Sequence, residues 1–144
     1  LNEQGLVLDA WDNPIRYIVT AWDSTSPAFT DVFTTADGMA TVGLSSLNPN
    51  LLVCNTATGI TSACATGEAL TADPGVPVVI FSTGKNGATG GTGTDEAENL
   101  DGDRFFVSHT PTASSFTNGE FDDLMVWISN QTLLNRMVSA GKLP

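Results

Sequence analysis

The sequence predicts a small α+β domain that is mainly β, with an antiparallel sheet of four or more strands and one short C-terminal helix. Three observations lead to this prediction. The chain has 144 residues, which fits a single domain over residues 1–144. It is rich in Thr, Gly and β-branched residues, which favour strands and turns over a helical bundle. Its apolar runs are short and separated by turns, so we expect successive strands to pair antiparallel.

β-branched runs and turn signals predict the first elements. A turn at residues 12–14 (DNP) precedes residues 15–22 (IRYIVTAW), whose composition predicts a strand. Residues 23–38 are rich in Ser, Thr and Asp and carry turn signals, so they are expected to connect elements. Residues 51–54 and 60–65 are expected to form a hairpin.

The later elements follow the same logic. Residues 77–82 (PVVIFS) are apolar on both faces, which is typical of a central strand. A loop is expected over residues 84–93, where five of ten residues are glycine, and an acidic loop over residues 95–103. Residues 104–108 and 124–128 predict two further strands.

The chain is expected to end in a short helix. Ser129 fits the N-cap position, and Gly141 ends the helix. The expected apolar face of the helix consists of Leu133, Leu134, Met137 and Val138. One short helix is too small to cover a sheet of four or more strands. We therefore expect a partner or an upstream segment to cover the apolar face of the sheet.

Cys54 and Cys64 enclose nine residues with the composition of a turn. Two thiols need further ligands to build a structural zinc site, and the only histidine, His109, is distant in sequence. The spacing favours a disulfide that closes a small loop and contributes about 2–3 kcal/mol in the chain-entropy model. Two buried free thiols in a cytosolic protein are the alternative. A disulfide indicates an oxidising compartment, so we expect a periplasmic or extracellular location.

The charge balance excludes one class of partner. The chain has 16 acidic and five basic residues, a net charge of −11, and no cluster of Lys and Arg. Nucleic-acid binding is therefore not expected. No run of 18 apolar residues occurs, so we expect no membrane-spanning segment within this sequence. The sequence does not begin with Met, and Leu1 is expected to mark a processed or trimmed end.

The patterns that would indicate catalysis are incomplete. Residues 82–85 (STGK) match the S-x-x-K pattern of penicillin-binding enzymes, but they end a strand instead of starting a helix. A small hydrolase using Ser82 and Lys85 is our third hypothesis. His109 is the only base available to a catalytic triad, and no nucleophile is placed to use it. Neighbours on a strand face opposite sides, so Asp122-Asp123 are not expected to share a site. We expect no enzymatic activity.

The acidic stretch at residues 95–103 is the best candidate for a metal site, because Ca²⁺ prefers several oxygen ligands. The stretch does not follow the EF-hand pattern. A solvated acidic loop without a metal is the alternative. The predicted calcium ligands are Asp95, Asn99, Asp101 and Asp103.

Three segments carry a resemblance to a known family. Residues 9–17 read DAWDNPIRY, residues 79–87 read VIFSTGKNG, and residues 121–128 read FDDLMVWI before a tail that ends at Pro144. In this order and spacing they resemble the globular heads of type IV pilins and type II secretion pseudopilins. The first segment is similar to the D-x-W-G-N-x-x-x-Y segment of that family, with Asp12 at the position of the usual Gly.

The resemblance implies an antiparallel sheet packed on a long N-terminal helix, which is absent from this chain. In the family that helix anchors the precursor in the inner membrane and, after cleavage by a prepilin peptidase, forms the core of a filament. The resemblance therefore implies a structural subunit, a minor pilin or pseudopilin, of a bacterial cell-surface filament. Its partners would be other pilin or pseudopilin subunits, and its surface loops would set subunit contacts and adhesion. Major pseudopilins bind calcium in a C-terminal acidic loop, and residues 95–103 occupy a similar region.

A second hypothesis comes from another functional class. A secreted, β-rich carbohydrate-binding module would use exposed tryptophan rings to stack on sugars. The candidates are Trp11, Trp22 and Trp127.

Overall fold

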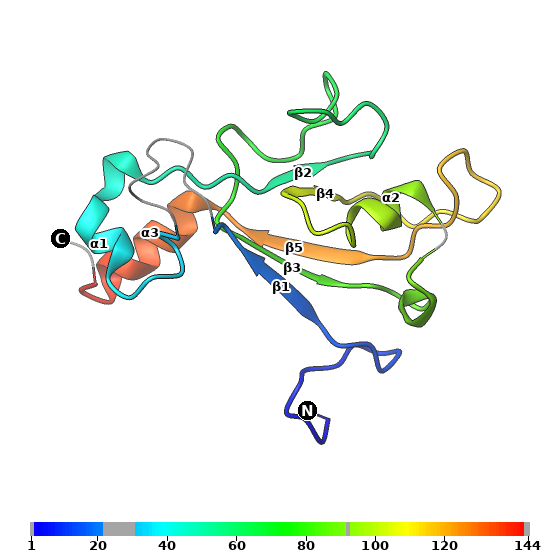
Figure 1. Cartoon of the computed structure of the whole chain (residues 1–144), viewed down its shortest axis with the longest axis horizontal. Helices are drawn as coiled ribbons and strands as arrows, with labels where there is room; N and C mark the ends of the chain where they lie inside the picture. Colours follow the sequence, from blue (N-terminus) through cyan, green and yellow to red (C-terminus); the bar gives the residue numbers. More distant parts are fainter. Residues whose placement is uncertain (1, 22–30, 92, 143–144) are drawn as a thin grey trace.

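A computed structural model describes residues 2–21, 31–91 and 93–142 of the chain. The described elements form a three-stranded antiparallel sheet, a two-stranded parallel pair and a helical region at one end of the molecule (Figure 1). In chain order they are β1 (Arg16–Val19), α1 (Gly38–Val42), the 3-10 turn η1 (Leu44–Ser46), β2 (Leu52–Cys54), β3 (Val78–Ser82), the 3-10 turn η2 (Gly87–Thr89), α2 (Thr94–Glu98), β4 (Phe105–Val107), β5 (Leu124–Ile128) and α3 (Asn130–Ser139).

The three-stranded sheet has the order β1-β3-β5, with both pairs antiparallel. Ile80, at the middle of β3, lies opposite Tyr17 on one side and Val126 on the other. The prediction of a central strand over residues 77–82 is therefore confirmed. Alternate side chains of β3 point to opposite faces of the sheet, so Val79 and Phe81 share one face and Ile80 lies on the other.

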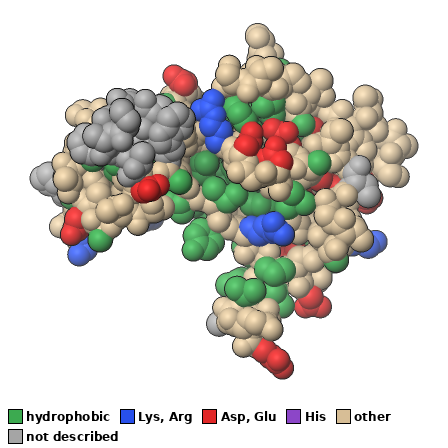
Figure 2. Space-filling view, viewed as in Figure 1, with side chains coloured by type: hydrophobic (Ala, Val, Ile, Leu, Met, Phe, Trp, Pro, Cys, Tyr) green, Lys and Arg blue, Asp and Glu red, His purple; other side chains and the backbone are tan. Residues whose placement is uncertain are grey.

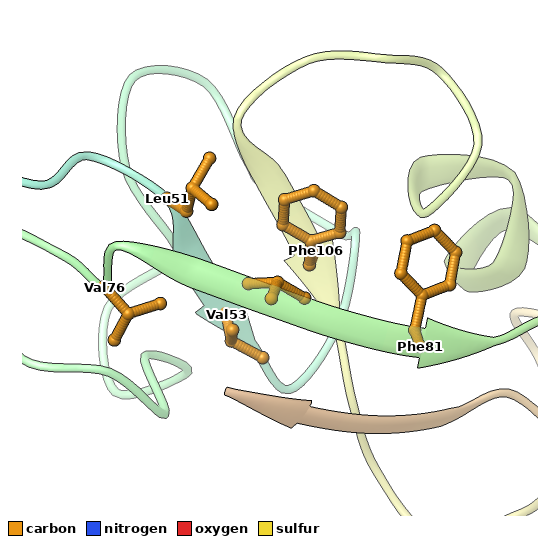
Figure 3. Packing of buried hydrophobic residues seen from close by; sticks show 6 residues of the cluster. Leu51, Val53, Val76, Phe81 and Phe106 are labelled. Carbon is orange, nitrogen blue, oxygen red and sulfur yellow. The ribbon is translucent and has the colours of Figure 1, made fainter. Parts of the chain in front are cut away.

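The second layer is the parallel pair β2 and β4, which covers the face of the sheet that carries Val79 and Phe81. Figure 3 shows Phe81 of β3 and Phe106 of β4 in the space between the two layers, with ring centroids 5.9 Å apart. The burial of these two rings removes large apolar side chains from water and so stabilises the packing of the two layers. The core comprises Leu51, Val53, Val76, Val79, Phe81 and Phe106.

The helical region has a small core of its own. Leu133, Leu134 and Met137 of α3 pack against buried Val32 and Met39, which confirms these three residues of the expected apolar face. The fourth, Val138, is 47% exposed, so its place on that face is wrong. Figure 1 shows α1 and α3 together at one end of the sheet. No helix in the described ranges is long and apolar enough to span a membrane.

The ends of α3 also agree with the sequence. The hydroxyl oxygen of Ser129 accepts a hydrogen bond from the backbone N–H of Thr132 at 3.2 Å, which makes Ser129 the N-cap. Gly141 has a φ of 65°, the left-handed conformation that ends a helix.

The expected antiparallel sheet of four or more strands is not found among the described residues. Residues 105–107 do form a strand, but it pairs in parallel with β2 in the second layer. All three of its residues are buried, which requires cover on both sides. A sequence pattern reports that a strand is buried, and it does not report which strand lies beside it.

Two local expectations need correction. Residues 60–65 form no strand, and Cys54 instead makes an isolated antiparallel bridge with Ala69. The start of the expected acidic loop is the short helix α2.

The disulfide between Cys54 and Cys64 is present, with Cα atoms 5.5 Å apart, and it closes the loop after β2. Much of the expected connecting segment at residues 23–38 lies outside the described residues.

Candidate functional site

The face of the β1-β3-β5 sheet that points away from the core is apolar, and we call it the outer face. Among the described residues no element covers it, and Tyr17, Leu124 and Val126 are 71%, 55% and 62% exposed. None of its side chains is charged, although the chain carries a net charge of −11. The outer face consists of Tyr17, Val19, Val78, Ile80, Ser82, Leu124, Val126 and Ile128.

A hollow of about 480 Å³ lies at one end of the outer face, between β5 and the N-terminal segment. Trp11 and Ile15 line it from one side, and Leu124 and Val126 from the other. Trp11 is 43% exposed. The apolar surface of the sheet therefore continues onto the segment that leads into β1.

A tight turn at residues 9–13 orders the segment before β1. The Oδ1 atom of Asp9 accepts hydrogen bonds from the backbone N–H groups of Trp11 and Asn13, at 2.9 and 2.8 Å. Its Oδ2 atom accepts a hydrogen bond from the hydroxyl of Ser82 at 2.5 Å. Desolvation acts to raise the pKa of Asp9, but these hydrogen bonds outweigh it and hold the pKa below its usual value. Asp12 has a φ of 66°, a left-handed conformation that Asp tolerates better than most residues.

The turn is also bonded to the glycine-rich loop. The side-chain amide of Asn13 donates a hydrogen bond to the Gly84 carbonyl at 2.7 Å. Gly84 has a φ of 61° and leaves no room for a Cβ atom, which would overlap the carboxylate of Asp122. Ser82 ends β3, Gly84 follows it, and Asp122 precedes β5. Three distant parts of the sequence therefore meet at this corner of the sheet.

Three carboxylates converge beside this corner. Glu96 of α2, Asp122 and Asp123 each offer an oxygen, and these oxygens lie within 4.8 Å of one another. The expectation that Asp122 and Asp123 do not share a site is therefore wrong. Both residues precede β5, in irregular backbone where the alternation of a strand does not apply.

Backbone and amide donors satisfy much of this carboxylate group. Glu96 is 1% exposed, and its carboxylate accepts hydrogen bonds from the side-chain amide of Asn86 at 3.0 and 3.1 Å and from the backbone N–H of Asp122 at 3.1 Å. Asp123 accepts a hydrogen bond from Asn99 at 2.7 Å. Glu96 therefore holds the glycine-rich loop against the segment that leads into β5.

Two of the three carboxyl groups have raised pKa values. Desolvation is the main cause for Asp123, and the nearby charges of Glu96 and Asp122 add to it against the hydrogen bond from Asn99, so its pKa rises to about 6. Desolvation also raises the pKa of Asp122, although the backbone N–H of Lys85 opposes the shift. Carboxylates held this close could take up either a proton or a cation.

The predicted calcium ligands are divided between different places. Asp101 and Asp103 form an exposed group with Glu98, and the oxygens of the three lie within 4.8 Å of one another. Figure 2 shows acidic side chains gathered over α2 and the loop after it. Desolvation and the charges of Asp101, Asp103 and Asp95 raise the pKa of Glu98. The structure thus adds Glu98 to the residues that could hold a cation, a role the sequence analysis did not assign.

The other two predicted ligands are engaged elsewhere. Asn99 is buried, and its side chain bonds to both backbone groups of Val107. Asp95 is 3% exposed, and its carboxylate accepts hydrogen bonds from the backbone N–H of Ala57 at 2.7 Å and from the Asn118 amide at 3.0 Å.

Asp95 also faces His109, with 3.2 Å between Oδ2 and Nε2. The other ring nitrogen, Nδ1, lies 2.7 Å from the carbonyl oxygen of Thr110. Both ring nitrogens therefore face oxygen atoms that accept hydrogen bonds, one from a carboxylate and one from a carbonyl. The ring stacks on Phe121 with centroids 3.9 Å apart. Neither the pair nor its partners could be found from sequence spacing, because Asp95, His109 and Asn118 belong to separate segments.

Ser82, the nucleophile of the hydrolase hypothesis, is hydrogen-bonded to a carboxylate, and the backbone N–H of Lys85 donates to Asp122. Ser82 ends β3, is 5% exposed and donates its hydroxyl hydrogen to Asp9. His109 is bonded to Asp95 and Thr110 instead. The arrangement gives Ser82 a structural role at the corner of the sheet.

The tryptophans of the carbohydrate hypothesis do not lie together on one face. Trp127 packs against the core, whereas Trp11 borders the hollow beside the outer face. Trp22 lies outside the described residues.

Comparisons with protein-family models, with curated proteins and with solved structures found no match to this chain.

Proposed function

We propose that this chain is the globular head of a type IV pilin-like or pseudopilin subunit, and that an upstream helix of the same subunit packs on the outer face. The observation that carries the proposal is the uncharged apolar outer face, which no described element covers. A contiguous apolar surface of this kind marks an interaction site. On a chain with a net charge of −11, the absence of acidic residues from this face also favours an apolar occupant.

The three segments that carry the family resemblance assemble into one unit, which supports the proposal. They supply β1, β3 and β5, which are neighbours in the sheet. Hydrogen bonds join them at one corner: Ser82 to Asp9, Asn13 to Gly84, and the backbone N–H of Lys85 to Asp122 at 3.1 Å. Three segments that are far apart in the sequence but meet in the structure support the family resemblance more specifically together than any one of them does alone.

The geometry of Asp12 supports the same interpretation. The family has Gly at this position, and glycine is the residue that adopts positive φ at no steric cost. Asp12 has a φ of 66° in the turn that Asp9 closes. Asp12 differs from the Gly of the family pattern but keeps the positive φ that glycine adopts readily.

The course of the chain before β1 favours an upstream helix of the same subunit as the segment that packs on the outer face. The segment before β1 lies against the edge of the outer face and lines the hollow there with Trp11. Figures 1 and 2 show this segment projecting from the body of the molecule with hydrophobic side chains on its surface. Leu6 and Val7 are 46% and 60% exposed. A helix that precedes this segment would continue an apolar projection that begins at the edge of the outer face.

The function that follows is structural and not enzymatic. The upstream helix would anchor the precursor in the inner membrane and then supply the filament core, and the partners would be other pilin or pseudopilin subunits. The loops of the head would set contacts between subunits and with surfaces outside the cell. The Cys54–Cys64 disulfide supports a periplasmic or extracellular location. Calcium bound at the acidic loop would belong to this role.

The test is intact-mass and N-terminal analysis of the native protein from sheared cell-surface and membrane fractions. We expect a longer chain that begins with an N-methylated Phe followed by a hydrophobic helix. A mature protein that begins at Leu1 would overturn the proposal, because it would lack a filament core.

Substitutions on the outer face and elsewhere on the surface test whether filament incorporation depends on the outer face. In the subunit carrying its upstream helix, Val126→Glu should prevent incorporation into sheared filaments, because a charge would be buried under the helix. Val138→Glu is the matched control, since Val138 is 47% exposed on α3, away from the outer face. Equal incorporation of the two variants would contradict the assignment of this face.

A further inference from the structure

A second hollow, of about 340 Å³, lies on the opposite layer of the molecule from the outer face. It is formed by the disulfide loop that follows β2 and by the segment that follows β4. Six of its nine lining residues are neutral Thr or Asn, and the one aromatic residue is Phe116. Its volume lies at the lower end of the range for small-molecule sites, about 300–1,000 Å³.

The floor of this hollow is held in place by Asp95. Its carboxylate accepts hydrogen bonds from Ala57, Asn118 and His109, which come from three different loops. The Asn118 amide also donates to the hydroxyl of Thr56 at 2.9 Å. Polar groups that are already fixed lose little entropy when a ligand binds, so the hollow is organised before any ligand arrives.

Phe116 lies at the rim. It is 63% exposed, on a turn in which its backbone N–H bonds to Ala113 and its carbonyl accepts from Gly119. Its phenyl ring is largely exposed beside the hydroxyl and amide groups that line the hollow. The apolar C–H face of a pyranose ring is a suitable partner for it, while the sugar hydroxyls are suitable partners for Thr and Asn.

The charges around the hollow select a neutral ligand. Among the described residues no Lys or Arg lines it, and the two ionisable side chains that do, Asp95 and His109, lie 3.2 Å apart and face each other. The net charge of −11 opposes an anionic ligand such as a sialylated or sulfated glycan.

We propose that this hollow binds a neutral hexose or N-acetylhexosamine, with Phe116 stacking on the sugar ring and the Thr and Asn groups bonding to its hydroxyls. This is a different site from the one that the tryptophans suggested. Because it lies on the layer opposite the outer face, it stays open when that face is covered. The inference does not depend on filament assembly and can be tested on this chain by itself.

The test is a titration of the ¹⁵N-labelled 144-residue chain with glucose, galactose, mannose, N-acetylglucosamine and N-acetylgalactosamine, followed by amide chemical shifts. We expect saturable shifts centred on Thr56, Thr112 and Asn118 for at least one sugar. Phe116→Ala should weaken that binding about tenfold, and Phe116→Tyr should restore it, because a phenol ring stacks as a phenyl ring does.

Tyr17→Ala is the matched control, because it removes another largely exposed ring, from the outer face. It should leave the sugar affinity unchanged. The inference is overturned if none of the five sugars shifts these amides, if the shifts centre on Trp11, or if Phe116→Ala binds as well as the parent chain.

Discussion

The side-chain amide of Asn99 pairs with Val107 as a neighbouring strand would. Its Oδ1 atom accepts the Val107 N–H at 2.7 Å, and its Nδ2 atom donates to the Val107 carbonyl at 3.1 Å. The same Nδ2 atom donates to Asp123 at 2.7 Å. One buried side chain therefore satisfies the free edge of β4 and links it to the segment that enters β5.

Replacing Asn99 by Ala should lower the free energy of unfolding by about 2–3 kcal/mol, because two backbone groups and a carboxylate lose their partner. Asn99→Asp should cost more, since it places a second carboxylate against Asp123. Urea unfolding measures both changes. Asn135→Ala, on the exposed side of α3, is the control and should change stability by less than about 0.5 kcal/mol. A neutral Asn99→Ala variant would show that the edge of β4 needs no such partner.

Replacing Gly84 or Gly90 by alanine distinguishes two effects of an added methyl group, namely backbone strain at positive φ and steric overlap. Both have positive φ, 61° and 82°, but a Cβ on Gly84 would overlap Asp122, whereas a Cβ on Gly90 meets nothing within 4 Å. Gly90→Ala should cost about 1–2 kcal/mol for its backbone conformation alone. Gly84→Ala should cost about 1–3 kcal/mol more, because the chain must move away from Asp122. Thermal and urea unfolding of the pair measure the difference, and equal losses would rule out the close approach.

The raised pKa of Asp123 predicts a pH dependence of stability. Its pKa rises from 3.8 to about 6 on folding, so the folded state binds this proton more tightly than the unfolded state. The resulting stabilisation is complete below about pH 4 and is lost as the pH rises through about 6. Between pH 4 and pH 7 the parent chain should lose on the order of 2 kcal/mol relative to Asp123→Asn, which cannot titrate. Urea unfolding across this range measures it.

Glu3→Gln is the control for that experiment, because Glu3 is an exposed carboxylate. It should follow the pH dependence of the parent chain. If Asp123→Asn does so too, the carboxyl group of Asp123 does not hold an additional proton in the folded state.

Calcium should raise the melting temperature of the chain if the acidic loop binds it, because a ligand that binds only the folded state stabilises it by mass action. A cation would also relieve the repulsion among Glu98, Asp101 and Asp103 that helps to raise the pKa of Glu98. Asp101→Ala should abolish the shift in melting temperature, measured by calorimetry in millimolar Ca²⁺ against Mg²⁺. Asp122→Asn, in the other carboxylate group, should leave it unchanged. If calcium does not shift the melting temperature of the parent chain, the acidic loop is a solvated loop that binds no calcium.

Local sequence predicted the elements whose cause is local. Residues 16–19, 78–82 and 124–128 are strands because β-branched and apolar side chains fit a pleated, buried surface. Ser129 begins α3 and Gly141 ends it, because capping depends on one side chain and one backbone angle. The disulfide was also predictable, since only nine residues with the composition of a turn lie between its two cysteines.

Tertiary structure alone decided which of these elements meet. The parallel pairing of β4 with β2 and the convergence of Glu96 with Asp122 and Asp123 join residues far apart in the sequence. So does the Asp95–His109 pair. Such contacts form because burying Phe81 against Phe106 outweighs the entropy of closing long loops, and no local pattern records that balance. The sequence by itself determined where the strands of the three-stranded sheet lie and that the chain is strongly acidic. The tertiary structure decided which face of the sheet stays uncovered and which polar groups come together around a hollow.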